Sequence, residues 1–172
     1  MTCIVTALKS EAQPIIDFLD LTKKEDKNFP IFTNHDTTLI VSGMGKINSA
    51  IAVTYIIPHD TMINIGICGS SSYKIGKMFN IKKIIDKSTQ KVIHINKDGE
   101  TLTCVDTPQN NPNEFKNTLV DMESFGFYQA ARMFVEKENI LLYKIVSDKI
   151  SDTILTPKEV HDLITPHLKK IF

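Results

Sequence analysis

The segment 120–124, with the sequence VDMES, carries an acidic side chain where a short apolar strand is expected to run into a helix. Glu123 would then lie at or near the helix N-terminus, where exposed backbone amides favour an anion and where Ser124 or Glu123 could cap the first turn. Ligands of doubly wound α/β sheets bind at such strand-to-helix junctions. A simpler interpretation makes Glu123 an ordinary first-turn acid, so a site here needs support from other residues.

Two further acids follow predicted strands in the same way. The apolar segment 140–146 predicts a central strand that runs into Ser147 and Asp148, and the strand expected at 2–7 is followed by Glu11. Parallel strands bring their carboxyl ends to one edge of a sheet, so we expect the three acids to meet there. Carboxylates gathered in this way can bind hydroxyl groups by charge-assisted hydrogen bonds and can act as general acid and general base.

Gly43 and Gly45 provide another candidate ligand contact, in the segment SGMG at 42–45. This segment follows a strand expected at 37–41 and opens a helix expected at 46–57, which Pro58 should end. Glycines at such a turn let the backbone approach a ligand, although two glycines also suit a tight turn without one. Lys46, the next residue, is either solvated or a cation near the pocket, and we favour the solvated side chain.

These candidate residues need an α/β scaffold, and the remaining pattern predicts one as a single domain over 1–172. Pro14 suits only a first turn, so the first helix should begin near Glu11. The segment KDGE at 97–100 predicts a hairpin turn between the strands on either side of it. Pro166 should kink or split the last helix. The other strands are expected at 29–32, 62–67, 82–86, 91–95 and 101–105, the helices at 11–21, 124–135 and from 156 towards 170, and the loops at 23–28, 106–113 and 149–156.

The composition is that of an ordinary globular protein, with 42% hydrophobic and 23% charged residues. The formal net charge is zero, so there is no electrostatic case for nucleic acid or a membrane surface as a partner. No apolar run approaches the roughly 20 residues of a membrane span, and the N-terminus lacks a signal-peptide pattern. Cys3, Cys68 and Cys104 indicate reduced thiols in a cytoplasmic protein, and neither they nor the five histidines have metal-ligand spacing.

Five short motifs occur in a familiar order: ALKSE at 7–11, SGMGKIN at 42–48, INIGICG at 63–69, VDMES at 120–124 and VSDK at 146–149. Together they resemble the nucleoside phosphorylase superfamily, in particular its branch of 5′-methylthioadenosine/S-adenosylhomocysteine nucleosidases. The similarity runs from the N-terminus to about Asp152 and fails between about 77 and 117. It implies an α/β fold with a central mixed β-sheet flanked by helices. It also implies hydrolysis of a purine nucleoside without metal or cofactor, and a homodimer in which a neighbour completes the pocket.

The resemblance assigns roles to individual residues. Glu123 would accept hydrogen bonds from the ribose 2′- and 3′-hydroxyls, with Met122 against the sugar face. Asp148, aided by Ser147, would protonate the purine at N7, which requires a raised pKa or a proton held in a hydrogen bond to the base. Glu11 would activate the attacking water as general base. The further substrate contacts that the resemblance implies are Leu8, Gly43 and Gly69.

The sequence also departs from the family pattern, which leaves alternatives open. Ile67 stands where relatives have a small polar residue, Ser70 replaces a second glycine, and the middle of the chain is shorter. A shortened relative could therefore bind nucleosides, or only self-associate, without turnover. A phosphate-dependent phosphorylase is a further alternative, but it needs a cationic cradle, and Arg132 is the only arginine. Hydrolysis is therefore favoured, while the 5′ substituent of the substrate is not predicted, because the region that would bind it does not align.

Overall fold

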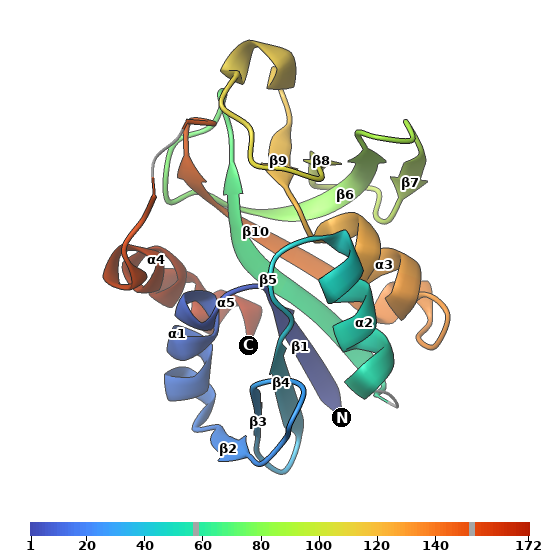
Figure 1. Cartoon of the computed structure of the whole chain (residues 1–172), viewed down its shortest axis with the longest axis vertical. Helices are drawn as coiled ribbons and strands as arrows, with labels where there is room; N and C mark the ends of the chain where they lie inside the picture. The colour runs from blue at the N-terminus through green and yellow to red at the C-terminus, as the bar shows by residue number, and fades with distance from the viewer. Residues whose placement is uncertain (57–58, 152–153) are drawn as a thin grey trace.

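The computed structural model describes residues 1–56, 59–151 and 154–172, whose elements surround one mixed sheet (Figure 1). The strands are β1 (Thr2–Thr6), β2 (Thr22–Lys24), β3 (Ile31–Thr33), β4 (Thr37–Val41), β5 (Thr61–Gly69), β6 (Met78–Asp86), β7 (Val92–His94), β8 (Glu100–Cys104), β9 (Leu119–Asp121) and β10 (Ile140–Asp148). The α-helices are α1 (Lys9–Leu19), α2 (Lys46–Ile56), α3 (Ser124–Ala131), α4 (Pro157–Ile164) and α5 (Leu168–Ile171), and the short 3-10 helices are η1 (Pro112–Phe115), η2 (Lys137–Asn139) and η3 (Thr165–His167). The expected α/β fold with a central mixed sheet and flanking helices is confirmed.

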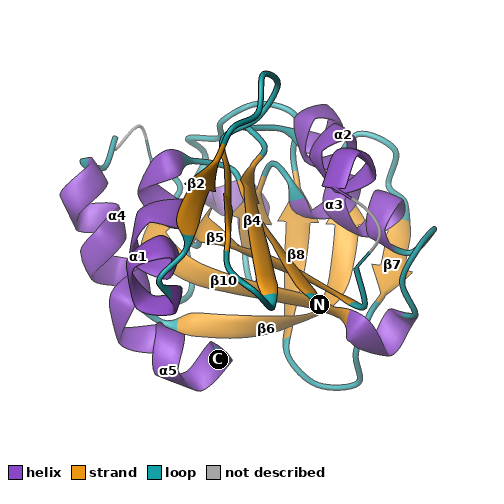
Figure 2. Cartoon of the chain, turned by 90° about the horizontal axis from the view of Figure 1, so that it is seen from below, coloured by secondary structure: helices purple, strands orange, loops and turns teal. Residues whose placement is uncertain are grey.

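The centre of the sheet consists of four parallel strands in the order β4-β1-β5-β10. Their residues are mostly buried, as is typical of parallel strands with near-continuous apolar sequence that helices cover on both faces. Helices α1, α4 and α5 lie on one side of the sheet, and α2 and α3 lie together on the other (Figure 2). The carboxyl ends of β1, β5 and β10 therefore reach the same edge.

The remaining strands curl the sheet back on itself. β10 pairs antiparallel with β6, β6 and β8 are parallel, β8 and β9 are parallel, and β9 meets β5 antiparallel at Gly69 and Val120. Since β10 also pairs with β5, these five strands form a closed ring. Closure removes free strand edges on this side of the sheet. It also brings the VDMES segment to the carboxyl end of β5.

Two expectations about strand pairing are wrong. β9 runs antiparallel to β5, so the three acids do not all come from parallel strands. The segments 91–95 and 101–105 do not form a hairpin, because β7 pairs back onto β6 and β8 crosses over to lie parallel to β6. Gly99 explains the difference: it has a φ of 127°, and an added Cβ would lie 2.4 Å from the carbonyl oxygen of Asn80. This glycine serves a close approach to β6 instead of a hairpin turn.

Helix α1 begins at Lys9 instead of near Glu11, and Pro14 lies inside it. The start is set by the carboxylate of Glu11, which accepts the backbone N–H groups of Ala7 and Leu8 and so satisfies donors that precede the helix. Pro14 removes one helical hydrogen bond, but its ring is buried in the core. The acid therefore determines where the helix starts, and the proline is tolerated in its second turn.

Other boundaries follow the sequence with small changes. Lys23 and Lys24 of the expected charged loop belong instead to the edge strand β2, which pairs with β3. The last helix is split as expected at Pro166, since α4 ends at Ile164 and η3 separates it from α5. The expected helix end at 57–58 and part of the expected loop 149–156 lie outside the described residues. No helix in the described ranges is long and apolar enough to cross a membrane.

Helices α2 and α3 pack against each other at Gly126. A Cβ on this residue would lie 1.9 Å from the carbonyl oxygen of Lys46, a contact that no side chain can make. We expect Gly126→Ala to lower the free energy of unfolding by roughly 2 kcal/mol, because overpacking outweighs the gain of about 1 kcal/mol in helix propensity. Urea denaturation of this variant, beside Gln129→Ala on the same helix as a control, measures the sign. A stabilised Gly126→Ala would contradict the packing.

Candidate active site

Glu11 is a buried acid that joins α1 to the end of the sheet. It is 2% exposed, and besides its two bonds in front of α1 its Oε1 accepts the N–H of Ile67 in β5 at 2.9 Å. Gly66 leaves the space for this contact, since a Cβ there would lie 2.8 Å from Oε1. Burial raises the pKa of Glu11, while the charge of Lys144 and the three amide donors act in the opposite direction.

Lys144 is the residue of the site that sequence reasoning missed. It lies in the middle of β10 with 1% exposure, and its Nζ is 2.8 Å from Oδ2 of Asp121. Burial disfavours its charge, but the carboxylates of Asp121, Glu123 and Glu11 together raise its pKa. A signal was present in the sequence, because a lysine inside an otherwise apolar central strand must find a buried acid.

Asp121 and Glu123 divide two tasks at the start of α3. Asp121 caps the helix, since its carboxylate accepts both the N–H and the hydroxyl of Ser124, at 2.9 and 2.7 Å. The expectation that Glu123 or Ser124 provides the cap is thus wrong, because Asp121 reaches the first free amide from the last residue of β9. Glu123 instead turns to the glycine loop, where its Oε1 accepts the N–H of Gly45 at 2.9 Å. Its Oε2 lies 3.3 Å from the N–H of Met122.

Burial and the surrounding charges bring the pKa of Glu123 close to neutral pH. Burial raises its pKa to about 7, the negative charges of Asp121 and Glu11 add to that rise, and Lys144 and the Gly45 amide oppose it. Three carboxylates share one buried ammonium here, so the cluster carries excess negative charge when all of them ionise. Glu123 therefore keeps a proton at pH values where an exposed glutamate is fully ionised.

Asp148 ends β10 and is fixed by two short hydrogen bonds. Its Oδ2 accepts the hydroxyl of Ser147 at 2.7 Å, and its Oδ1 accepts the N–H of Ile150 at 2.7 Å. A Cβ on Gly69 would come within 3.1 Å of Oδ1, so the glycine leaves room for the carboxylate. Ile150 has a φ of 60°, which is unusual for a β-branched residue, and its side chain is buried.

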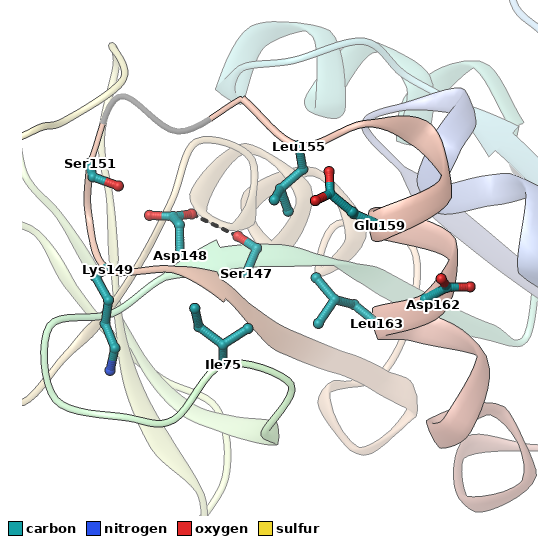
Figure 3. A pocket seen from close by; sticks show the side chains of 9 residues that line it. All are labelled: Ile75, Ser147, Asp148, Lys149, Ser151, Leu155, Glu159, Asp162 and Leu163. Carbon is teal, nitrogen blue, oxygen red and sulfur yellow. Dashed lines mark hydrogen bonds between the residues drawn. The ribbon is translucent and has the colours of Figure 1, made fainter.

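A cavity of about 460 Å³ borders Asp148 on the side of α4 (Figure 3). Ser147 and Asp148 form one wall, and Leu155 with α4 forms the opposite wall. The rim carries the acids Glu159 and Asp162. Glu11 and Glu123 do not line this cavity, so the candidate site has two parts.

The structure places the eight candidate residues in these two parts, which meet across the carboxyl end of β5. Cys68 lies between them, close enough to Lys144, Asp121 and Asp148 for their charges to act on the pKa of its thiol. The first part surrounds Lys144 and contains Glu11, Glu123, Leu8, Met122 and Gly43, and the second contains Asp148, Ser147 and Gly69. Gly43 has a φ of 83° and donates its N–H to the carbonyl of Ala7, which ties the glycine loop to β1.

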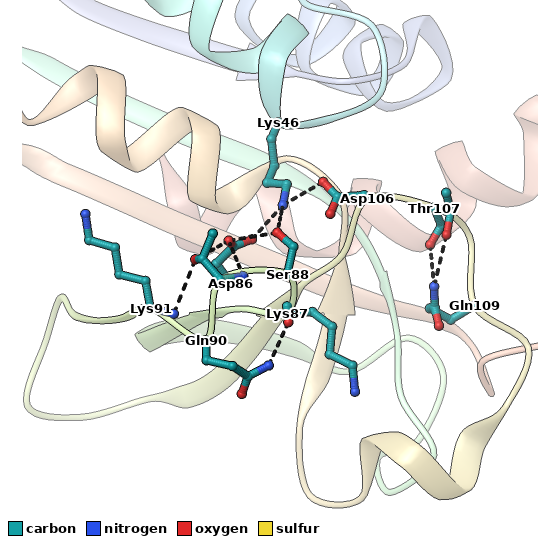
Figure 4. A network of polar contacts seen from close by, with 10 residues as sticks. Lys46, Asp86, Lys87, Ser88, Gln90, Lys91, Asp106, Thr107 and Gln109 are labelled. Atoms are coloured by element: carbon teal, nitrogen blue, oxygen red, sulfur yellow. Dashed lines mark hydrogen bonds and ion pairs between the residues drawn. The ribbon is translucent and has the colours of Figure 1, made fainter.

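Lys46 is not the solvated side chain that we favoured. It is 15% exposed, and its ammonium group contacts Asp86 and Asp106, each at 2.6 Å (Figure 4). The sequence could not indicate this, because Asp86 and Asp106 lie at the ends of two strands whose pairing the sequence does not reveal. Arg132, the other cation considered for a phosphate site, is exposed at the end of α3.

Comparison with solved structures identifies the fold, although neither a protein-family model nor a curated protein matches the sequence. A mutant MTAN of Chlamydia trachomatis matches at a TM-score of 0.78 with 17% identity, over 99% of this chain and 96% of that chain. A mutant MTAN of Helicobacter pylori with 5′-methylthioadenosine in the active site matches at 0.80 with 15% identity, over the same shares. The protein thus has the same fold as these nucleosidases. Two further solved structures that match, from Helicobacter pylori and Neisseria meningitidis, are 5′-methylthioadenosine/S-adenosylhomocysteine nucleosidases, with TM-scores of 0.79 and 0.74 and identities of 16% and 14% over 99% and 96% of this chain.

The raised pKa of Glu123 makes stability depend on pH. Its pKa is about 7 in the folded protein against 4.5 ordinarily, so its contribution is fully present below about 4.5 and is lost as pH rises through about 7. We expect wild type to lose up to about 3 kcal/mol relative to Glu123→Gln across this window. Urea denaturation at several pH values, with the exposed Glu136→Gln as control, measures the difference. A constant difference between wild type and Glu123→Gln would contradict the raised pKa.

Proposed function

We propose that the protein hydrolyses the N-glycosidic bond of a purine nucleoside of the 5′-methylthioadenosine or S-adenosylhomocysteine type. The observation that carries this proposal is the convergence of the buried acids Glu11 and Glu123 on Lys144, with Asp148 at the adjacent strand end. The fold supports it, because a matching Helicobacter pylori structure holds 5′-methylthioadenosine in its active site.

Glu123 binds the ribose in this mechanism. A vicinal diol presents two donors, and the two carboxylate oxygens accept one each, with charge-assisted strength. The oxygens are already oriented by the amides of Gly45 and Met122, so little rearrangement is needed when the sugar binds. The Met122 side chain is partly exposed, so it is free to pack against the sugar face of a bound nucleoside.

Glu11 and Asp148 carry out the proton transfers. Glu11 takes a proton from water, the water oxygen bonds to the anomeric carbon, and the bond to the purine nitrogen breaks with its electron pair moving to the base. Asp148 delivers a proton to N7, so the purine leaves as a neutral molecule together with the free sugar. Burial raises the pKa of Glu11, which suits a general base working near neutral pH.

Water is favoured over phosphate as the nucleophile because the nearby cations are already paired. Lys46 contacts two carboxylates, and Lys144 is bound to Asp121. Arg132 is exposed at the far end of α3. A phosphate dianion would therefore meet a site with excess negative charge and few donors, whereas a neutral water molecule would not.

Nucleoside binding without turnover is the second candidate, and Ile67 favours it. Its N–H holds Glu11, but its side chain packs among the apolar residues beside α1 and offers no polar contact to a water molecule. The proposed hydrolysis needs no metal or cofactor, since an acid, a base and water suffice. The cytoplasmic location expected from the sequence stays a prediction.

Release of the free base from a panel of nucleosides, with and without phosphate, tests the reaction. We expect release without phosphate, and a loss of about 100-fold or more in kcat for Glu11→Gln and Asp148→Asn, because each removes one proton transfer. Glu123→Gln should mainly raise KM, because it weakens the grip on the diol. The exposed Asp98→Asn serves as a control. A folded wild-type protein that binds 5′-methylthioadenosine without releasing base would support the second candidate, and release only with phosphate would indicate a phosphorylase.

A homodimer through α2 is the assembly that we propose. The residues Met44, Ile47, Ile51 and Tyr55 form an exposed apolar stripe along this helix, each between 43 and 75% exposed. The stripe begins inside the glycine loop, so a second copy related by a two-fold axis would cover the helix and reach the sugar side of the site.

Sedimentation of charged variants tests this assembly. We expect Ile51→Glu to convert a dimer to a monomer, because a buried unpaired charge at the centre of the interface is strongly unfavourable. Phe18→Glu, which places the same charge on α1 at the opposite side of the sheet, should leave the dimer intact. A wild-type monomer, or an Ile51→Glu variant that stays dimeric, would contradict the proposed interface.

A further inference from the structure

We propose that Lys46 is a positioning residue for Glu123: it anchors the glycine loop whose backbone N–H holds that carboxylate. This inference rests on the proposed function of Glu123 in binding the ribose. Lys46 touches neither Glu123 nor the cavity beside Asp148, so it would act only through the loop that precedes α2.

The side chain of Lys46 is held firmly on the outer strands (Figure 4). Its Nζ lies 2.6 Å from Oδ1 of Asp86 at the end of β6 and 2.6 Å from Oδ1 of Asp106 after β8, and it donates to the hydroxyl of Ser88 at 3.1 Å. The Asp86 side chain is only 2% exposed, and its other oxygen accepts the hydroxyls of Ser88 and Thr89. The Lys46–Asp86 pair is thus largely shielded from solvent and held by several hydrogen bonds, unlike a mobile surface ion pair, whereas Asp106 is 56% exposed.

The backbone of Lys46 is held as firmly from the other side. Its carbonyl oxygen packs on Gly126 of α3 so closely that no side chain fits there. Glu123 immediately precedes this same helix, and its Oε1 returns to the N–H of Gly45, the residue before Lys46. The glycine loop therefore contacts Glu123 through Gly45 and contacts α3 through Lys46, and Glu123 leads directly into α3.

The glycine loop needs such an anchor. Gly43 and Gly45 both have positive φ values, 83° and 100°, and glycine restricts the backbone least of all residues. A Cβ on Gly45 would meet nothing within 4 Å, so no packing confines the backbone on that side. Gly43 ties one end of the loop to β1 through Ala7, and the bonds from Lys46 hold its other end. Without the bonds from Lys46, we expect the Gly45 amide to be directed less well towards Glu123.

Loss of the hydrogen bond from the Gly45 amide would change the pKa of Glu123. The charged groups that face it are Asp121 from β9, Lys144 from β10 and Glu11 from α1, and the Gly45 amide is the contact that the glycine loop supplies. Lys46 does not contact these other groups, so replacing it leaves them in place. Removal of a hydrogen bond to the ionised carboxylate favours its protonated form, which raises the pKa of Glu123 and weakens binding of the diol.

Nuclear magnetic resonance of protein with 13C-labelled glutamate side chains tests this directly, with the Glu123 signal assigned by its absence in Glu123→Gln. The test variant is the double substitution Lys46→Met with Asp86→Asn, which leaves no uncompensated charge in the core. We expect the pKa of Glu123 to rise by about 1 unit, and the KM of the hydrolysed nucleoside to rise about tenfold at neutral pH with a smaller change in kcat. Lys46→Arg should keep most of the wild-type behaviour, because it keeps a cation at this position.

Lys87→Met is the matched control, since Lys87 makes an exposed ion pair with Glu114 on the same side of the sheet and does not reach the glycine loop. It should leave the titration of Glu123 unchanged. A double variant that is less stable but has the wild-type Glu123 titration would show that Lys46 is only structural and would overturn the proposal. A wild-type protein that releases no base would contradict the proposed function, while the titration would still decide the role of Lys46.

Discussion

The structure of the candidate site depends on one buried ammonium group among three carboxylates. Burying a carboxylate without a partner is strongly unfavourable, and Asp121, Glu123 and Glu11 are all less than 10% exposed. Lys144 makes their burial tolerable, with a direct ion pair to Asp121 and longer-range attraction to the others. Burial raises the pKa values of Glu11 and Glu123, and one cation shared among three acids offsets that rise only in part. The raised pKa of Glu123 weakens the fold at high pH, and the raised pKa of Glu11 suits the general base proposed above.

Two glycines of β5 leave space for acidic side chains to lie against the backbone of the sheet. Gly66 leaves room for the Glu11 carboxylate next to Lys144, and Gly69 leaves room for Asp148. The ring of strands then brings β9 to the end of β5, so that Glu123 arrives from an antiparallel strand while Glu11 and Asp148 follow parallel ones. The same crowding pairs Lys46 and Lys144 with carboxylates, which supports the proposal of a neutral nucleophile over phosphate.

The sequence predicts the features of this fold that depend on neighbouring residues, and it misses those that depend on how distant strands and side chains pair. Strands that run into acids are visible because apolar runs end abruptly at Glu11, Glu123 and Asp148. The split of the last helix is visible because proline acts on its own neighbours. The direction of β9 and the crossover at Gly99 are set by contacts with strands far away in the chain. The partners of Lys46 and Lys144 are equally hard to predict, because nothing in the sequence next to a lysine indicates which distant aspartate will bind it.

Glu11, Glu123 and Asp148 each accept a backbone N–H, and in each case a contact made elsewhere in the fold holds that amide in place. Glu11 is held by Ile67 in a central strand, and Glu123 by Gly45 next to Lys46. Asp148 is held by the N–H of Ile150, whose left-handed backbone is unfavourable by roughly 1–3 kcal/mol for a β-branched residue. The burial of the Ile150 side chain in an apolar cluster with Phe115 offsets that strain. Apolar packing thus orients Asp148 as an ion pair orients Glu123, so substitutions that never touch a nucleoside should still alter how these acids work.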